Sequence, residues 1–132
     1  MNIRPKDSDS GVTNLMFCCS GVADTAEIGD RAVRSLHKAG AAKMFCVAGI
    51  AARVELIENN TRGADCLLVV DGCVSDCAKK TMESGGFSDI VHFRVTDLGF
   101  EKGKTPVTDQ RIATVAGKLR ELLGTQTHVG EA

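Results

Sequence analysis

The sequence contains no tryptophan and no tyrosine, and its 132 residues include only five phenylalanines. Proteins that bind single-stranded nucleic acid stack its bases on aromatic side chains, so this class of function is disfavoured. An excess of one charge is also lacking, because 16 Lys and Arg residues face 17 Asp and Glu residues, for a formal net charge of -1. We therefore expect neither nucleic acid nor a membrane as a partner.

Long apolar runs are missing as well. No stretch approaches the roughly 18 apolar residues of a membrane-spanning helix. The polar segment "MNIRPKDSDSGV" (1–12) predicts a flexible arm and not a secretory signal, and residues 125–132 predict a flexible tail. These features favour a cytoplasmic protein. In that reducing compartment the six cysteines are poorly explained by disulfides, so they must pack in the core, bind a metal or react.

Apolar strand-like runs alternate with amphipathic helical segments four times along the chain. The expected strands cover 14–19, 42–47, 65–72 and 89–95, and the expected helices cover 24–40, 51–60, a short segment ending near 84–86, and 108–123. This alternation predicts an α/β fold: a single three-layer Rossmann-like domain over residues 13–124. We expect about four parallel strands in the order 2-1-3-4, with helices on both faces.

Four cysteines fall where three of these strands end. Cys19 ends the first strand, Cys46 ends the second, Cys73 follows the third, and Cys77 lies four positions later. Open parallel sheets bind ligands outside the carboxyl ends of their strands. The four thiols should therefore share one crevice, where the N-termini of the following helices would lower their pKa values.

Four thiolates suit a tetrahedral zinc ion. The C-x3-C spacing of Cys73 and Cys77 is, however, a weaker signal than C-x2-C, and free cysteine is a common core residue. The residues alone leave a metal site and a set of packed cysteines with one reactive thiol equally open. Cys18 should point away from Cys19 and pack under a helix, and Cys66 should pack at the remote end of the third strand.

Several segments together resemble the DGC domain family of zinc-binding proteins, named after the motif seen here as Asp71-Gly72-Cys73. They are "FCCSG" (17–21), "MFCVAGI" (44–50), "VVDGCVSDCAKK" (69–80) and "VTDLGFEK" (95–102). The resemblance implies four chelating cysteines, which match Cys19, Cys46, Cys73 and Cys77. Some members read C-S-G-C where this chain has Val22, so Cys18 is a candidate replacement ligand.

Other polar residues are assigned more ordinary positions. Asp71 is interpreted as a turn former, with orientation of a thiol neighbour as the alternative, and Asp76 is expected to face solvent. None of the three histidines, His37, His92 and His128, has a convincing ligand position. The segment "GFEKGKT" (99–105) has three residues between its glycines where a P-loop needs four, although its lysines, Lys102 and Lys104, could attract an anion.

The sequence therefore predicts a metal-binding protein in which Cys19, Cys46, Cys73 and Cys77 hold one zinc ion. The alternative is a thiol-based redox or sulfur-transfer protein, in which Cys19 or Cys73 is the low-pKa thiol and Cys77 or Cys46 resolves the intermediate. An iron–sulfur cluster on the same cysteines is a third hypothesis. No reaction, protein partner or oligomeric state follows from the pattern.

Overall fold

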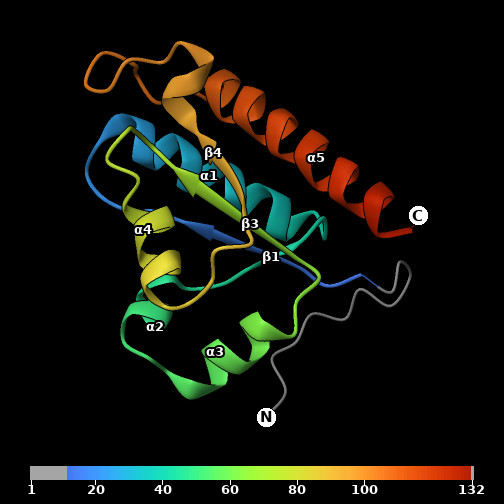
Figure 1. Ribbon diagram of the computed structural model, residues 1–132. Coiled ribbons are helices and arrows are strands. Elements are labelled where there is room, and N and C mark those ends of the chain that lie inside the picture. The colour runs from blue at the N-terminus through green and yellow to red at the C-terminus, as the bar shows by residue number, and fades with distance from the viewer. Residues whose placement is uncertain (1–11, 132) are drawn as a thin grey trace.

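The computed structural model describes residues 12–131, which form a parallel sheet covered by helices on both faces (Figure 1). The strands are β1 (Asn14–Cys18), β2 (Lys43–Met44), β3 (Cys66–Asp71) and β4 (Val91–Arg94). The helices are α1 (Asp24–Lys38), α2 (Val47–Ala51), α3 (Glu55–Arg62), α4 (Cys77–Ser84) and α5 (Asp109–Glu131), with a short 3-10 helix over Val95–Leu98. The sheet order is β2-β1-β3-β4, which confirms the predicted α/β topology.

Alternating side chains of the central strands build two separate cores. Met16 and Cys18 of β1 pack on the side of α1 and α5, whereas Leu15 and Phe17 pack on the side of α2 and α4. Strand β3 is buried along its whole length. Such two-sided burial explains why both strands are nearly continuous apolar runs in the sequence.

The second crossover differs from the predicted single helix over 51–60. The strand before it, predicted over 42–47, is only Lys43–Met44, and Cys46 already serves as the N-cap of α2. Arg53 then adopts a left-handed backbone conformation with φ 61°, which separates α2 from α3. The prediction was wrong here because "GIAAR" contains no proline, and its one glycine lies inside α2 and not at the break.

The last helix begins as predicted and continues further. The Thr108 hydroxyl accepts a hydrogen bond from the Arg111 amide at 3.2 Å, which is an N-cap interaction. Val115, Leu119 and Leu123 are buried against the α1 side of the sheet. Helix α5 passes Gly124, where the sequence predicted its end, and reaches Glu131. Most of the predicted N-terminal arm lies outside the described residues.

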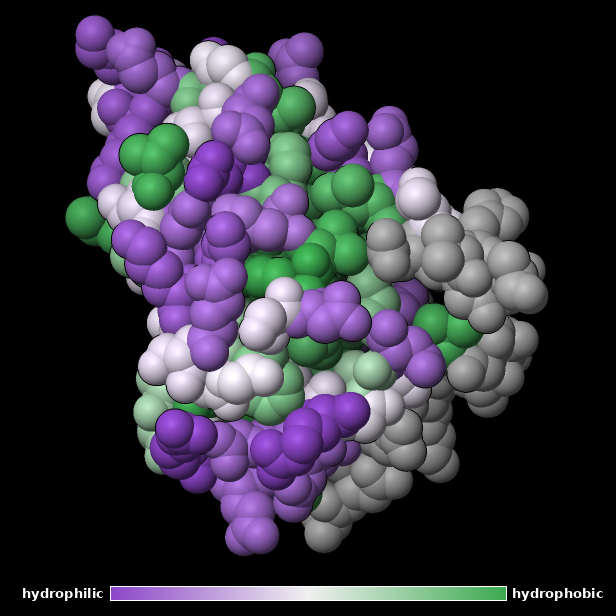
Figure 2. All heavy atoms as spheres, viewed as in Figure 1, coloured by the Kyte–Doolittle hydropathy of each residue, from purple (hydrophilic) through white to green (hydrophobic). Residues whose placement is uncertain are grey.

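The surface in the view of Figure 2 is mainly hydrophilic, with hydrophobic side chains gathered across its middle between α5 and the lower helices. Among the described residues, no helix combines the length and apolar character needed to cross a membrane.

Candidate thiol and metal site

The predicted cysteine rim lies where the sheet changes the direction of its connections. Strands β1 and β3 are neighbours, yet the chain leaves β1 through α1 toward β2 and leaves β3 through α4 toward β4. Helix α1 covers one face of the sheet and α4 covers the other (Figure 1). The two loops that carry Cys19 and Cys73 therefore border the crevice at which open α/β sheets bind ligands.

Cys19 connects the ends of β1 and β3. Its backbone amide donates to the Val70 carbonyl at 3.0 Å, and its Sγ accepts a hydrogen bond from the Gly72 amide at 3.1 Å. A hydrogen bond from the Cys18 thiol, followed by the one from the Gly72 amide, lowers the pKa of the Cys19 thiol, although partial burial opposes this. Cys19 is thus the half-buried thiol on which local donors favour the thiolate.

Cys73 is the second thiol with a lowered pKa. Hydrogen bonds from the Ser75 side chain and backbone are the main cause of the lowered pKa of Cys73, with a further contribution from the Lys102 ammonium. The Lys102 Nζ lies 3.7 Å from the Cys73 Sγ. Lys102, from the segment 99–105 that resembles a P-loop, therefore attracts the thiolate of Cys73. This segment is not followed directly by a helix, as a P-loop would be.

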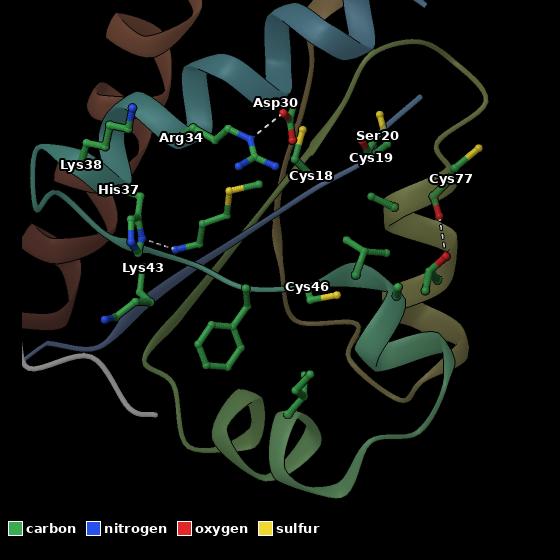
Figure 3. A pocket seen from close by; sticks show the side chains of 17 residues that line it. Cys18, Cys19, Ser20, Asp30, Arg34, His37, Lys38, Lys43, Cys46 and Cys77 are labelled. Atoms are coloured by element: carbon green, nitrogen blue, oxygen red, sulfur yellow. Dashed lines mark hydrogen bonds and ion pairs between the residues drawn. The ribbon is translucent and has the colours of Figure 1, made fainter. Parts of the chain in front are cut away.

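Cys46 and Cys77 complete the rim from the α2 and α4 side. Both are exposed, Cys46 as the N-cap of α2 and Cys77 as the first residue of α4. Strand β2 ends at Met44, and the Phe45 amide still donates to the Met16 carbonyl at 2.8 Å, which holds the segment before Cys46 beside β1. Figure 3 shows Cys19, Cys46 and Cys77 around one pocket; Cys73 does not line it.

No three of the four predicted sulfurs lie within 4.8 Å of one another. Within the described part of the chain, the one group of three or more metal-ligating side chains with ligand atoms all within 4.8 Å is Asp71, Asp76 and His92. Tetrahedral zinc needs sulfurs only about 3.7 Å apart, as follows from a Zn–S distance near 2.3 Å. A zinc ion on all four thiolates would therefore require the loops to close around it.

The group of Asp71, Asp76 and His92 was not predicted, and its oxygens are already used. Asp71 is buried and accepts hydrogen bonds from the Ala78 and Lys79 amides at 2.7 and 3.0 Å, and it lies 2.9 Å from the His92 Nε2. Asp71 is therefore a cap for the first turn of α4, and the interpretation as a turn former was incomplete.

Asp76 was expected in solvent, and that prediction was wrong. Its carboxylate is buried under a two-pronged ion pair with Arg94, with both N···O distances at 2.6 Å. The Arg94 hydrogen bonds lower the pKa of Asp76. Because Arg94 already neutralises Asp76, and Asp71 binds the α4 amides, this network holds the loop of Cys73 and Cys77 in place and is a poor cation site.

Two cysteines lie in the predicted positions outside the set of four. Cys66 starts β3 at the far end of the sheet, and burial raises the pKa of its thiol to about 11. Cys18 is buried in the α1-side core, as expected. It was not expected to contact Cys19, but the chain leaves the strand at Cys18, so the alternation of side chains ends there. The hydrogen bond that it donates to Cys19, together with burial, raises the pKa of Cys18.

The DGC domain family model matches residues 15–119, which include both thiol loops and the first half of α5. The chain is also 27% identical over 88 residues to "Anaerobic and virulence modulator AnvM" from Pseudomonas aeruginosa strain PAO1, and the alignment covers 67% of each chain. No solved structure matches the chain significantly. The family match spans well over half of the sequence, and the chain therefore belongs to the DGC domain family.

Proposed function

We propose that this protein binds one zinc ion through the thiolates of Cys19, Cys46, Cys73 and Cys77. The observation that carries the proposal is that Cys19, Cys46 and Cys77 line one cavity, Cys73 lies four residues before Cys77 in the connection from β3 to α4, and local donors lower the pKa of Cys19 and Cys73. Soft thiolate donors fit zinc, which binds the deprotonated form of cysteine. Membership of a family associated with metal binding supports the same conclusion.

The surroundings of the thiols also suit the charge of such a site. Four thiolates around a divalent ion leave two excess negative charges, which need nearby donors. The Gly72 amide at Cys19 and the Lys102 ammonium at Cys73 supply two such donors. Cys18 would remain a donor to Cys19 or take the place of a ligand.

Metal content of anaerobically purified protein tests the proposal. We expect about one zinc per chain, and cobalt substitution should produce thiolate-to-metal absorption bands. These bands are easily seen because the chain has neither tryptophan nor tyrosine. Cys46→Ser and Cys77→Ser should each reduce the retained metal, whereas Cys66→Ser, at the remote end of β3, is the matched control. Full metal retention in all of these variants would refute the four-thiolate site.

A thiol-disulfide reaction is the second candidate, because the pKa values of Cys19 and Cys73 are both lowered. The thiolate would attack one sulfur of a substrate disulfide and release the other sulfur as a thiolate. Cys77 or Cys46 would then attack the mixed disulfide, release the reduced substrate and leave an intrachain disulfide. In this case Cys77→Ser should trap the mixed disulfide, and the first thiol should still be alkylated rapidly.

A further inference from the structure

A cavity of about 1260 Å³ adjoins the thiols and is larger than the rim needs for a metal ion. Pockets of roughly 300–1,000 Å³ hold most small-molecule ligands. The sulfurs of Cys19 and Cys46 border one part of the cavity. Lys38 and Lys43 lie away from the thiols in Figure 3, whereas the guanidinium of Arg34 points toward Asp30 and Cys18.

The end of the cavity away from the thiols is cationic although the whole chain is slightly acidic. Lys38 and Lys43 line it, and the Arg34–Asp30 pair, which lies nearer Cys18, adds no net charge, so two positive charges are in excess. Asp30 binds the Arg34 Nε at 2.8 Å, which leaves the two terminal nitrogens of the guanidinium for another acceptor. Within residues 12–125, no carboxylate pairs with Lys38 or Lys43.

His37 adds a donor to this cationic end. Its Nδ1 accepts a hydrogen bond from the Met44 amide at 3.0 Å, so the proton of the neutral ring is on Nε2. The described contacts thus leave this part of the cavity with donors and with few acceptors. Charge complementarity favours an acid group as the occupant.

The wall between the two ends is apolar and has a defined length. Met44 and Phe45 line the cavity between Lys43 and Cys46 along the same extended segment. Three residues of extended chain span about 10 Å. Met44 packs toward the α1-side core and Phe45 toward the α2-side core. A bound molecule can therefore place an acid group at the lysines, a short apolar body on one of these two side chains, and its other end at the thiols.

We propose that the cavity binds a small organic anion whose acid group lies about 10 Å from the end that faces the thiols. This inference rests on the proposed function and extends it, because a metal held by the thiols would contact the end of the ligand that faces them. The cationic end itself does not depend on the metal. The two proposals can therefore fail separately.

Alkylation of the reduced, metal-free chain tests the inference with two maleimides of similar length. The anionic probe is 6-maleimidohexanoate, the neutral probe is N-hexylmaleimide, and mass spectrometry measures the rate at Cys46. We expect the anionic probe to react faster, and Lys38→Gln/Lys43→Gln should slow it by at least about threefold without slowing the neutral probe. Added salt should reduce the difference between the probes.

Two control variants separate charge from structure. Lys38→Arg/Lys43→Arg keeps the charges and should keep the preference, and Lys80→Gln removes an exposed charge of α4 that does not line the cavity. An unchanged anionic preference in the double Gln variant, or equal slowing of both probes, would overturn the inference. The Gln substitutions should leave the zinc content unchanged. Loss of zinc in the cysteine variants therefore tests the metal proposal separately.

Discussion

At the scale of single residues, Gly72 has the most demanding position of the DGC motif. A Cβ built on it would lie 2.7 Å from the Ala26 nitrogen and 2.8 Å from the Ala26 Cα, so a side chain would push β3 and α1 apart. Gly72→Ala should lower the free energy of unfolding by about 1–3 kcal/mol, as overpacking does. Urea unfolding of the two proteins measures this difference.

The same substitution should change the chemistry of Cys19. The Gly72 amide helps to lower the pKa of the Cys19 thiol, and moving that amide away from Sγ raises the pKa. A thiol with a higher pKa needs a higher pH to form the thiolate, so the alkylation profile of Cys19 should shift to higher pH. Gly21→Ala is the control, because nothing lies within 4 Å of a Cβ at that position. An unshifted profile in Gly72→Ala would show that this hydrogen bond has no effect.

At the scale of elements, α4 begins on the Asp71 carboxylate. Asp71→Ala removes the acceptor of two buried or half-buried amides and the partner of His92. We expect the free energy of unfolding to fall by about 2–4 kcal/mol, from the lost cap and the unpaired donors. Asp71→Asn should cost less because its amide oxygen still accepts one of these bonds. Urea unfolding measures the loss in free energy of unfolding. The control is Asp89→Ala, at an exposed position. An equal loss in the Asp71 and Asp89 variants would contradict the role of Asp71 as a cap of α4.

The elements show which parts of the fold are readable from the sequence. Buried strands β1 and β3 and the amphipathic helix α1 were predicted because hydrophobic burial leaves a periodic pattern. The left-handed Arg53 and the extension of α5 leave no such pattern. His92 was given no ligand position by the sequence, but on β4 it lies 2.9 Å from Asp71 and 3.6 Å from Asp76, so the loop that carries Asp76 covers it. A polar face that packs on another polar group has the same sequence pattern as one in solvent.

At the scale of the whole molecule, the order of the strands follows from the crossover rules, and with it the rim to which Cys19, Cys46 and Cys73 belong. The distances between their sulfurs do not follow. They depend on loop conformations and on partners from distant elements, such as Lys102 at Cys73. The sequence therefore predicts the neighbourhood of the thiols, while the hydrogen bonds that distinguish Cys19 and Cys73 from the other cysteines come from the assembled fold.

Zinc should consequently stabilise the entire domain, because its four proposed ligands join the ends of β1, β2 and β3 to the start of α4. An ion that binds the folded state at a free concentration of 100 times its dissociation constant contributes about 2.7 kcal/mol. For a domain of this size that corresponds to a rise in Tm of roughly 10 °C, less whatever zinc binds to the unfolded thiols. Thermal unfolding of the reduced protein with and without zinc measures the rise, and Cys66→Ser should preserve it. Cys46→Ser should lose most of it, since this residue alone connects β2 to the proposed site, and a full rise in that variant would exclude Cys46 as a ligand.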